Sequence, residues 1–252
     1  MIGLFDSGSG GLTVLRAIRN ALPSVDVLYF GDIKHAPYGS KTQEELFELT
    51  VNAIKLLYDR GARNIVSACN SVSGSLAVSL FDAFDISSTQ IIEMVGPTVA
   101  YFRGSPARIL LCATPATVRS GLYQNAFRMI GKDITVVAIS ELAGAIEFGK
   151  PENELRSIIN EGFKDLSAKD FDVVILACTH YPLVADLFAE LFSAPTVFDP
   201  AVAVAARVEK LFSPKEAGEG KTTFLVSKDS APFRRVVEEL FPDMAYTVEV
   251  LK

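Results

Sequence analysis

Short apolar runs alternate along the chain with longer stretches in which apolar and polar residues recur at helical spacing. The apolar runs are rich in β-branched residues, which is typical of strands buried on both faces of a parallel sheet. They are Ile2–Phe5, Val27–Phe30, Asn64–Ala68, Gln90–Val95, Arg108–Cys112, Ile134–Ile139, Asp172–Ala177 and Thr222–Val226. This alternation of strands and helices predicts an α/β fold with mostly parallel sheets.

The best-defined helix begins after Thr42. Its apolar face comprises Leu46, Leu49, Ala53, Ile54 and Leu57. Thr42 and Glu45 have the spacing of a capping box, and Gly61 follows the expected end of the helix. Asp199 and Pro200 similarly predict the cap and first position of a later helix.

Two segments of the chain resemble each other. Residues 62–71 read ARNIVSACNS and residues 171–180 read FDVVILACTH, so each is an apolar strand that ends in Ala-Cys. An apolar strand with a polar turn lies upstream of each, and the spacing from Asp6 to Cys69 is 63 positions against 64 from Thr114 to Cys178. We therefore expect two pseudo-symmetric α/β domains, residues 1–95 with 205–252 and residues 96–204, with the active site in the cleft between them. We also expect a helix after each cysteine and a C-terminal segment that returns to the first half.

Polar residues follow the predicted strands at the sheet edge where α/β proteins bind ligands. The turn Asp6-Ser7-Gly8-Ser9-Gly10-Gly11 could point N–H groups at an anion, although it matches neither GxGxxG nor a Walker motif. Asp6 ends a buried strand and needs a partner, for which an ammonium group or a thiol proton is suitable. A tight turn explains those glycines equally well, and a structural turn is the favoured interpretation of the loop Pro37-Tyr38-Gly39-Ser40.

The cysteines differ in their neighbours. Cys69 is followed by Asn70 and Ser71, whereas Cys178 is followed by Thr179 and His180. A thiol near a helix N-terminus is expected to have a lowered pKa, and a histidine beside a thiol can exchange a proton with it. Cys112 has no such neighbours and fits an ordinary buried thiol.

Two further sites are ambiguous. Thr114 and Thr117 supply hydroxyls at a strand-to-helix turn, but simple capping by Thr117 would explain them as well. Glu147 lies near a helix end, where a solvated glutamate is the usual case.

Composition narrows the function classes. The formal charge is −6 and the basic residues are scattered, which argues against nucleic acid as a partner. No segment has the apolar length of a membrane helix and no secretion signal is recognisable, so three free cysteines suggest a cytoplasmic protein. The dispersed cysteines and histidines predict no metal site, and nothing indicates a nicotinamide, flavin or nucleotide cofactor.

Two thiols on opposite sides of one cleft fit a particular reaction. Inversion of a carbon centre requires that one group removes a proton from one face and another delivers a proton to the opposite face. A free thiol has a pKa of about 8.5, so modest tuning suffices for both roles. Asp6 is a suitable helper for Cys69 and His180 for Cys178. The residues thus favour an α-proton racemase or epimerase acting on a small molecule.

The motifs IGLFDSGSGGLTVLR, PYGSK, ACNS, TPATVRSGLY and LACTHYPL resemble those of the glutamate racemases, within the aspartate/glutamate racemase superfamily. The resemblance covers nearly the whole chain. It implies cofactor-independent interconversion of L- and D-glutamate, which supplies D-glutamate to peptidoglycan. It maps the catalytic cysteines to Cys69 and Cys178 and an acidic helper to Glu147. Substrate-binding positions map to Asp6, Ser7, Pro37, Tyr38, Gly39, Ser40, Asn70, Ser71, Thr114, Thr117, Thr179 and His180.

The chain departs from that family at three places near the expected cleft. Ser71 replaces a threonine, Gly96-Pro97 replaces Glu-Pro, and the residues before Glu147 match poorly. A racemase for aspartate or another small amino acid is therefore a second hypothesis, and a non-catalytic binding or regulatory protein on the same scaffold is a third. The sequence leaves a homodimer open.

Overall fold

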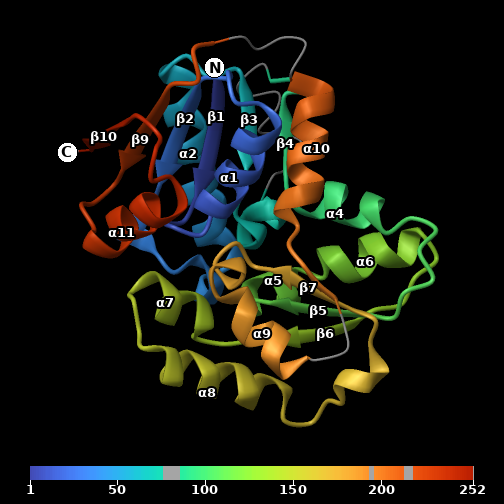
Figure 1. Cartoon of the computed structure of the whole chain (residues 1–252). Coiled ribbons are helices and arrows are strands. Elements are labelled where there is room, and N and C mark those ends of the chain that lie inside the picture. Colours follow the sequence, from blue (N-terminus) through green and yellow to red (C-terminus); the bar gives the residue numbers. More distant parts are fainter. Residues whose placement is uncertain (76–85, 193–195, 213–217, 252) are drawn as a thin grey trace.

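The computed structural model of the chain describes residues 1–75, 86–192, 196–212 and 218–251. Within these ranges the strands form two sheets, and every neighbouring pair of strands is parallel. The two sheets lie in separate halves of the molecule (Figure 1). This architecture confirms the predicted α/β fold class.

The first sheet has the strand order β10-β9-β2-β1-β3-β4. Its strands are β1 (Ile2–Asp6), β2 (Val27–Gly31), β3 (Asn64–Ser67), β4 (Ile91–Ile92), β9 (Thr222–Val226) and β10 (Tyr246–Val250). Because β9 pairs with β2, the C-terminal segment returns to the sheet that the N-terminus begins. The residues at which one domain gives way to the other stay a prediction.

The second sheet has the order β6-β5-β7-β8. Its strands are β5 (Ile109–Ala113), β6 (Thr135–Ala138), β7 (Val173–Ala177) and β8 (Thr196–Phe198). This order repeats that of β2-β1-β3-β4, with β5 in the place of β1 and β7 in the place of β3. The internal resemblance in the sequence thus corresponds to a repeated topology, and Cys69 and Cys178 follow equivalent strands.

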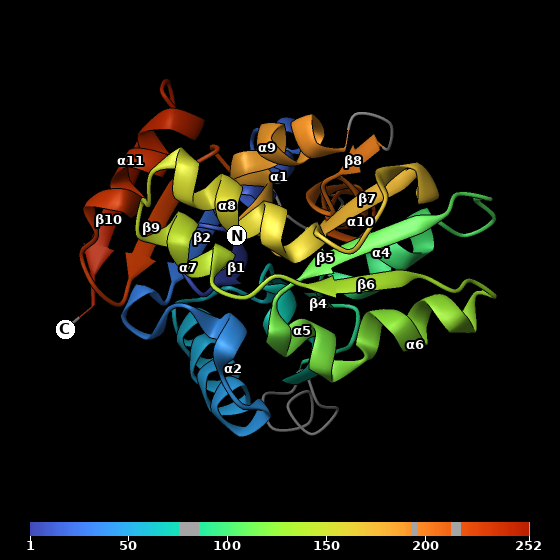
Figure 2. The ribbon, with the colours of Figure 1, turned by 90° about the horizontal axis from the view of Figure 1, so that it is seen from below.

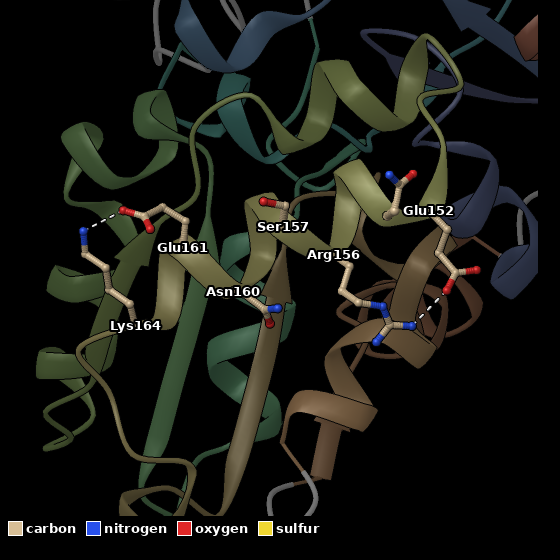
Figure 3. A pocket seen from close by; sticks show the side chains of 7 residues that line it. Glu152, Arg156, Ser157, Asn160, Glu161 and Lys164 are labelled. Carbon is tan, nitrogen blue, oxygen red and sulfur yellow. Dashed lines mark hydrogen bonds and ion pairs between the residues drawn. The ribbon is translucent and has the colours of Figure 1, made fainter.

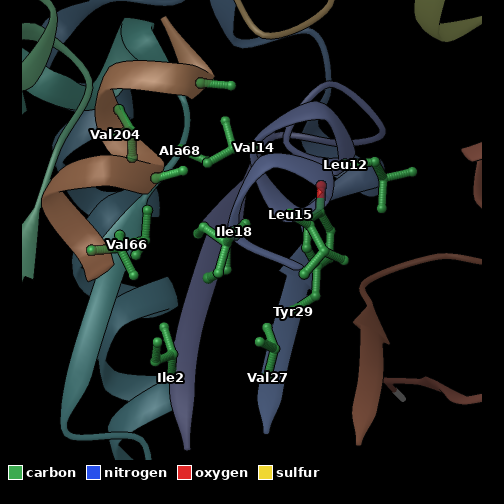
Figure 4. Close-up of a cluster of buried hydrophobic side chains, with 14 of the residues drawn as sticks. Ile2, Leu12, Val14, Leu15, Ile18, Val27, Tyr29, Val66, Ala68 and Val204 are labelled. Carbon is green, nitrogen blue, oxygen red and sulfur yellow. The ribbon is translucent and has the colours of Figure 1, made fainter. Parts of the chain in front are cut away.

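Helices cover both faces of the first sheet. On one face α1 (Leu12–Ala21), α10 (Ala201–Phe212) and α11 (Ala231–Leu240) pack against the strands. Figure 4 shows Val204 of α10 and Ile18 of α1 directed into the same apolar cluster as Val66 of β3. The other face is covered by α2 (Gln43–Asp59), through the apolar positions that the sequence pattern selected.

The second sheet is covered in the same manner (Figure 2). One face contacts α4 (Val95–Tyr101) and α6 (Leu122–Met129). The other face contacts α7 (Leu142–Glu147), α8 (Glu152–Phe163) and α9 (Ala185–Leu191). A short helix, α5 (Pro115–Ser120), follows β5 and lies between the halves.

The cap signals in the sequence are largely confirmed. Thr42 Oγ1 accepts a hydrogen bond from the Glu45 N–H at 3.2 Å, and Glu45 Oε2 accepts one from the Thr42 N–H at 2.8 Å. Gly61 follows α2 with a φ of 95°, where a side chain would be strained. Asp199 Oδ1 accepts from the Ala201 N–H at 2.9 Å, which confirms its role as a cap, although α10 itself begins at Ala201, one residue later than predicted.

Some predictions were wrong. β6 is half-exposed because it is an edge strand, so it is not buried on both faces. The short β8 and the solvent-exposed β10 were not predicted as strands. A 3₁₀ segment, Asn70–Ser75, follows Cys69, and because residues 76–85 lie outside the described part, the α-helix expected there stays a prediction. After Cys178 the expected helix is present as α9. None of the helices in the described ranges has the length and apolarity that crossing a bilayer requires.

Candidate active site

A small cavity lies where the carboxyl ends of β1 and β3 face those of β5 and β7. Both sheets reverse their strand order between these strands, which is where α/β folds bind ligands. Both thiols, Cys69 and Cys178, line this one cavity. Its other lining residues are Ser7, Pro37, Tyr38, Gly39, Asn70, Ser71, Thr114, Ala143, Thr179 and His180.

The cavity has a volume of about 10 Å³, which is room for roughly one water molecule. The halves interlock around it through glycines. A Cβ on Gly8 would lie 2.6 Å from the Glu147 carboxylate oxygens, and one on Gly10 would lie 2.6 Å from Thr179 Oγ1. The two halves therefore pack closely around the cavity, and its volume in this structure is smaller than a molecule the size of an amino acid.

A buried network of polar side chains extends from Cys178. Its Sγ atom lies 3.9 Å from Nδ1 of His180, and Nε2 of His180 lies 2.7 Å from Oε2 of Glu147. The same Glu147 oxygen accepts hydrogen bonds from the N–H of Ser9 at 2.8 Å and from its hydroxyl at 2.7 Å. Glu147 is only 2% exposed, so the expectation of a solvated surface glutamate was wrong.

These contacts determine the charge state of the pair. Burial opposes a charge on His180, but its contacts with Cys178 and Glu147 outweigh burial and raise its pKa well above the ordinary value. Burial likewise opposes a charge on Glu147, yet His180 and Ser9 lower its pKa below the ordinary range. We therefore assign an imidazolium and a carboxylate, and both imidazole nitrogens donate hydrogen bonds.

Cys69 has a different environment. Its Sγ atom lies 4.0 Å from the Ser7 hydroxyl. Burial raises the pKa of Cys69 well above the ordinary value, and the nearby Asp6 and Cys178 raise it further. The expectation of a thiol with a lowered pKa was therefore wrong for this residue, because burial and neighbouring negative charge exceed any effect of the short 3₁₀ segment.

Asp6 is fully buried behind the cavity wall. Its Oδ1 accepts from the Gly8 N–H at 2.9 Å, and its Oδ2 accepts from the Thr179 hydroxyl at 3.0 Å. Burial raises the pKa of Asp6, although His180 and these hydrogen bonds oppose the shift. The carboxylate thus joins the two halves through neutral donors, where an ammonium or thiol partner was expected.

Three hydroxyls meet across the halves at the opposite end of the cavity. Ser71 Oγ lies 2.9 Å from Thr114 Oγ1, which lies 3.1 Å from Thr117 Oγ1. Thr114 is the N-cap of α5 and accepts from the Thr117 N–H at 3.3 Å, so the alternative of capping by Thr117 was wrong. Hydroxyls grouped in this way can donate together to a carboxylate.

Asn70 and Tyr38 are each oriented by a neighbour. Asn70 Oδ1 accepts from the Tyr123 hydroxyl at 2.6 Å, while Asn70 Nδ2 is buried with no hydrogen-bond partner among the described residues. Tyr38 donates to Asp32 at 2.6 Å, and His35 lies 2.8 Å from the same carboxylate. The loop that carries Tyr38 and Gly39 is thereby held against the cavity.

Some of the predicted site residues do not line the cavity, and some residues of the site were not predicted. Ser40 is exposed and lines a neighbouring hollow, while Asp6, Thr117 and Glu147 lie behind the lining residues. Ala143, Ser9 and Tyr123 were not selected from the sequence. Ser9 is part of the glycine-rich turn, which is a usable signal, but Ala143 and Tyr123 read as ordinary helix positions.

Other features of the described chain differ in kind from this cavity. Cys112 is fully buried in the apolar core of the second half. No group of three or more His, Cys, Asp or Glu side chains in the described ranges could hold a metal ion. A larger hollow of about 780 Å³ follows the outer face of α8, where Arg156 pairs with Glu152 at 2.8 Å and Lys164 with Glu161 at 2.6 Å (Figure 3). It carries solvated ion pairs and lacks the convergent buried groups of a reactive site.

Comparison with known sequences gives a consistent result. Residues 3–208 match the Asp/Glu/hydantoin racemase family. The chain is 32% identical over 252 residues to the glutamate racemase of Deinococcus radiodurans, in an alignment that covers 96% of this chain and 86% of the relative. It is also 32% identical over 256 residues to the glutamate racemase of Aquifex aeolicus, with 99% of both chains covered.

Solved structures agree. A glutamate racemase from Thermus thermophilus, in complex with β-chloro-D-alanine, superposes with a TM-score of 0.82 at 29% identity and covers 100% of this chain and 96% of its own. A glutamate racemase from Bacillus anthracis superposes with a TM-score of 0.88 at 23% identity, covering 100% and 97% of the two chains, and supports the fold alone.

Proposed function

The chain belongs to the Asp/Glu/hydantoin racemase family and is an amino-acid racemase, and we propose that it interconverts L- and D-glutamate with Cys69 and Cys178 as its two acid/base groups. The observation that carries this proposal is that both thiols line one cavity, each at the end of an equivalent strand of a repeated topology. The relatives named above, which are glutamate racemases, support the choice of substrate.

The reaction follows from the placement of the sulfurs. One cysteine, as thiolate, removes the Cα proton from one face, and the other, as thiol, delivers its own proton to the opposite face. The sulfurs exchange protonation states in each turnover, so the reverse reaction uses the same groups in opposite roles. Both proton transfers are made by protein side chains, and the proposal requires no cofactor.

The electrostatics favour one resting arrangement. The imidazolium of His180, 3.9 Å from the Cys178 sulfur, stabilises a negative charge there. Burial and Asp6 raise the pKa of Cys69, which keeps that sulfur protonated. We therefore propose that Cys69 is the sulfur that carries a proton before substrate binds, and that it delivers this proton to a substrate whose Cα hydrogen faces Cys178.

Donors around the cavity suit a substrate with two carboxylates. Asn70 Nδ2 is an unused donor, and the hydroxyls of Ser71 and Thr114 meet at the cavity wall. Removal of the Cα proton places negative charge on the α-carboxylate, where such donors stabilise the transition state. Hydroxyls at the cavity wall can also hold the side-chain carboxylate of the substrate, and this contact would distinguish glutamate from uncharged amino acids.

The cellular role follows as part of the proposal. D-glutamate made by this reaction would supply peptidoglycan, and therefore cell-wall biogenesis and cell shape. The three cysteines are free, which fits the reducing conditions of the cytoplasm. The homodimer that the sequence left open stays a prediction.

The decisive experiment follows the α-hydrogen of L-glutamate in heavy water. Two-base chemistry predicts that, early in the reaction, deuterium enters the D-glutamate formed while the remaining L-glutamate keeps its protium. Transfer of the substrate's own protium into the product would contradict it. If glutamate is inert but aspartate exchanges, the substrate assignment fails, and if no amino acid exchanges, the binding-protein hypothesis gains.

Variants of the cysteines complete the test. Cys69→Ala and Cys178→Ala should each lower the rate of racemisation in both directions by about 10²–10⁴-fold, the typical cost of a missing acid or base. Cys112→Ala is the matched control, because it removes a buried thiol outside the cavity. It should retain wild-type activity.

A further inference from the structure

Tyr123 is a buried polar residue that the mechanism above does not use. It lies on α6 of the second half, is fully buried, and packs in the apolar cluster with Phe127. Its hydroxyl donates to Asn70 Oδ1 at 2.6 Å, and Asn70 belongs to the first half. This hydrogen bond therefore spans the two halves directly beside the cavity.

The bond determines which end of the Asn70 amide faces the cavity. The oxygen and the NH₂ group of an asparagine have nearly the same shape, so only hydrogen bonding distinguishes the two orientations. Tyr123 engages the oxygen, which leaves Nδ2 as the free end. That nitrogen is buried and has no partner among the described residues, while Asn70 is 4% exposed and lines the cavity.

The phenol is suited to a permanent donor role. Burial raises the pKa of Tyr123 well above its ordinary value, and Glu93 adds to the shift while Thr98 opposes it. A phenol that keeps its proton always presents a donor to Asn70. The amide oxygen is then always the engaged end, whatever the pH of the assay.

We propose that Tyr123 is a positioning residue that orients the Asn70 amide so that its NH₂ group binds a carboxylate of the substrate. The inference rests on the function proposed above. Without the phenol hydroxyl the amide rotates freely, and its oxygen meets the negatively charged substrate in part of the population. In that part of the population the substrate carboxylate has no hydrogen-bond donor from Asn70, because the amide has lost its preferred orientation.

The kinetic test is a double-mutant cycle between Tyr123→Phe and Asn70→Ala. Tyr123→Phe should lower kcat/KM for both enantiomers of glutamate roughly three- to tenfold, the range of one neutral hydrogen bond. In the Asn70→Ala background the same change should alter kcat/KM less than twofold, because the residue through which it acts is missing. Equal losses in both backgrounds would show a merely structural role and overturn the proposal.

A second measurement does not depend on turnover. In ¹⁵N-labelled protein, the side-chain NH₂ signals of Asn70 are identified by their loss in Asn70→Ala. They should shift strongly in Tyr123→Phe, while the NH₂ signals of the exposed Asn52 and Asn153 stay in place. An unshifted Asn70 signal would contradict the proposal. If wild-type protein leaves glutamate unchanged, the proposed function fails, yet this comparison still decides the role of Tyr123.

Discussion

Glu147 and His180 form a buried pair of oppositely charged side chains behind the cavity. Both are nearly inaccessible, and one oxygen of Glu147 serves His180 and Ser9 together. The other oxygen, Oε1, has no hydrogen-bond partner in the described ranges. If one member of such a buried pair is removed, the charge of the other is left buried without a partner. The remaining group then favours its neutral form.

Glu147→Gln should therefore change the pH dependence of the reaction. The pKa of His180 is raised in the wild type, so the imidazolium is lost only as the pH rises well above 6.5. Without the negative partner this pKa falls, and the alkaline decline of kcat/KM should move to lower pH. A pH–rate profile measures the shift.

The matched control is Glu154→Gln on α8, which makes the same chemical change at an exposed ion pair with Lys150. Its profile should coincide with that of the wild type. An alkaline limb that stays in place in Glu147→Gln would mean that the charge on His180 is not set by Glu147.

From the local sequence pattern, site residues could be predicted only where they follow the end of a predicted strand. Cys69 and Cys178 each follow an apolar strand, so parallel-sheet geometry placed each of them at the ligand-binding edge of its own sheet. Glu147 was identified by resemblance, since nothing in its local sequence predicts burial. Tyr123 lies on an amphipathic helix, where an aromatic residue indicates core packing, and its partner Asn70 is 53 positions away.

At the scale of elements, the turn after β1 brings the halves together. Gly8, Gly10 and Gly11 each lie where a Cβ would be less than 3.0 Å from another side chain. For Gly8 and Gly10 these are side chains of the second half, so absence of a side chain is what permits the approach.

Gly8→Ala should displace the Glu147 carboxylate. The added Cβ would lie 2.6 Å from both carboxylate oxygens, and a misplacement of about 1 Å near a reactive centre can cost about 100-fold in rate. We expect kcat/KM to fall roughly 10- to 100-fold while the protein remains folded. Gly74→Ala is the control, since its nearest neighbours would lie at 3.5 Å. Similar activities of the two variants would contradict the argument.

The capping box of α2 tests a purely structural element. Thr42→Ala removes one acceptor at the helix N-terminus, which typically costs about 1 kcal/mol of stability. For a chain of this size the Tm should fall by about 2–4 °C. Thermal unfolding measures the change, and kcat/KM should stay at the wild-type value. An unchanged Tm would mean that water replaces the cap at no cost.

The elements that the sequence predicted well are those with a strong period or a cap. The apolar face of α2 and its capping box were both correct, because local chemistry dictates them. β8 has only three residues, and β10 exposes most of its side chains, so neither produces the continuous apolar run of a buried strand. Their pairing depends on strands that are distant along the chain.

At the scale of the whole molecule, the chain leaves the first sheet after β4 and returns to it with β9. β9 lies between β2 and β10, and its residues Phe224, Leu225 and Val226 are nearly inaccessible. The first half is thus completed only by the last segment of the sequence.

Truncation should distinguish these two C-terminal strands. A chain that ends at residue 212 lacks β9 and α11, so it exposes both faces of the first core and should not unfold cooperatively. A chain that ends at residue 245 loses only the edge strand β10 and should fold with a lower Tm. Size-exclusion chromatography and thermal unfolding make the comparison. Cooperative unfolding of the shorter chain would contradict the central role of β9.

The unequal surroundings of the two sulfurs have a consequence for the forward and reverse reactions. Cys178 stands beside an imidazolium and Cys69 beside a serine hydroxyl near a buried carboxylate. The two mirror-image forms of an amino acid have equal free energy in water, so their equilibrium constant is one. Thermodynamic balance then requires equal kcat/KM in both directions. The asymmetry of the site must therefore appear as matched differences in kcat and KM, so that the enantiomer with the larger kcat also has the proportionally larger KM.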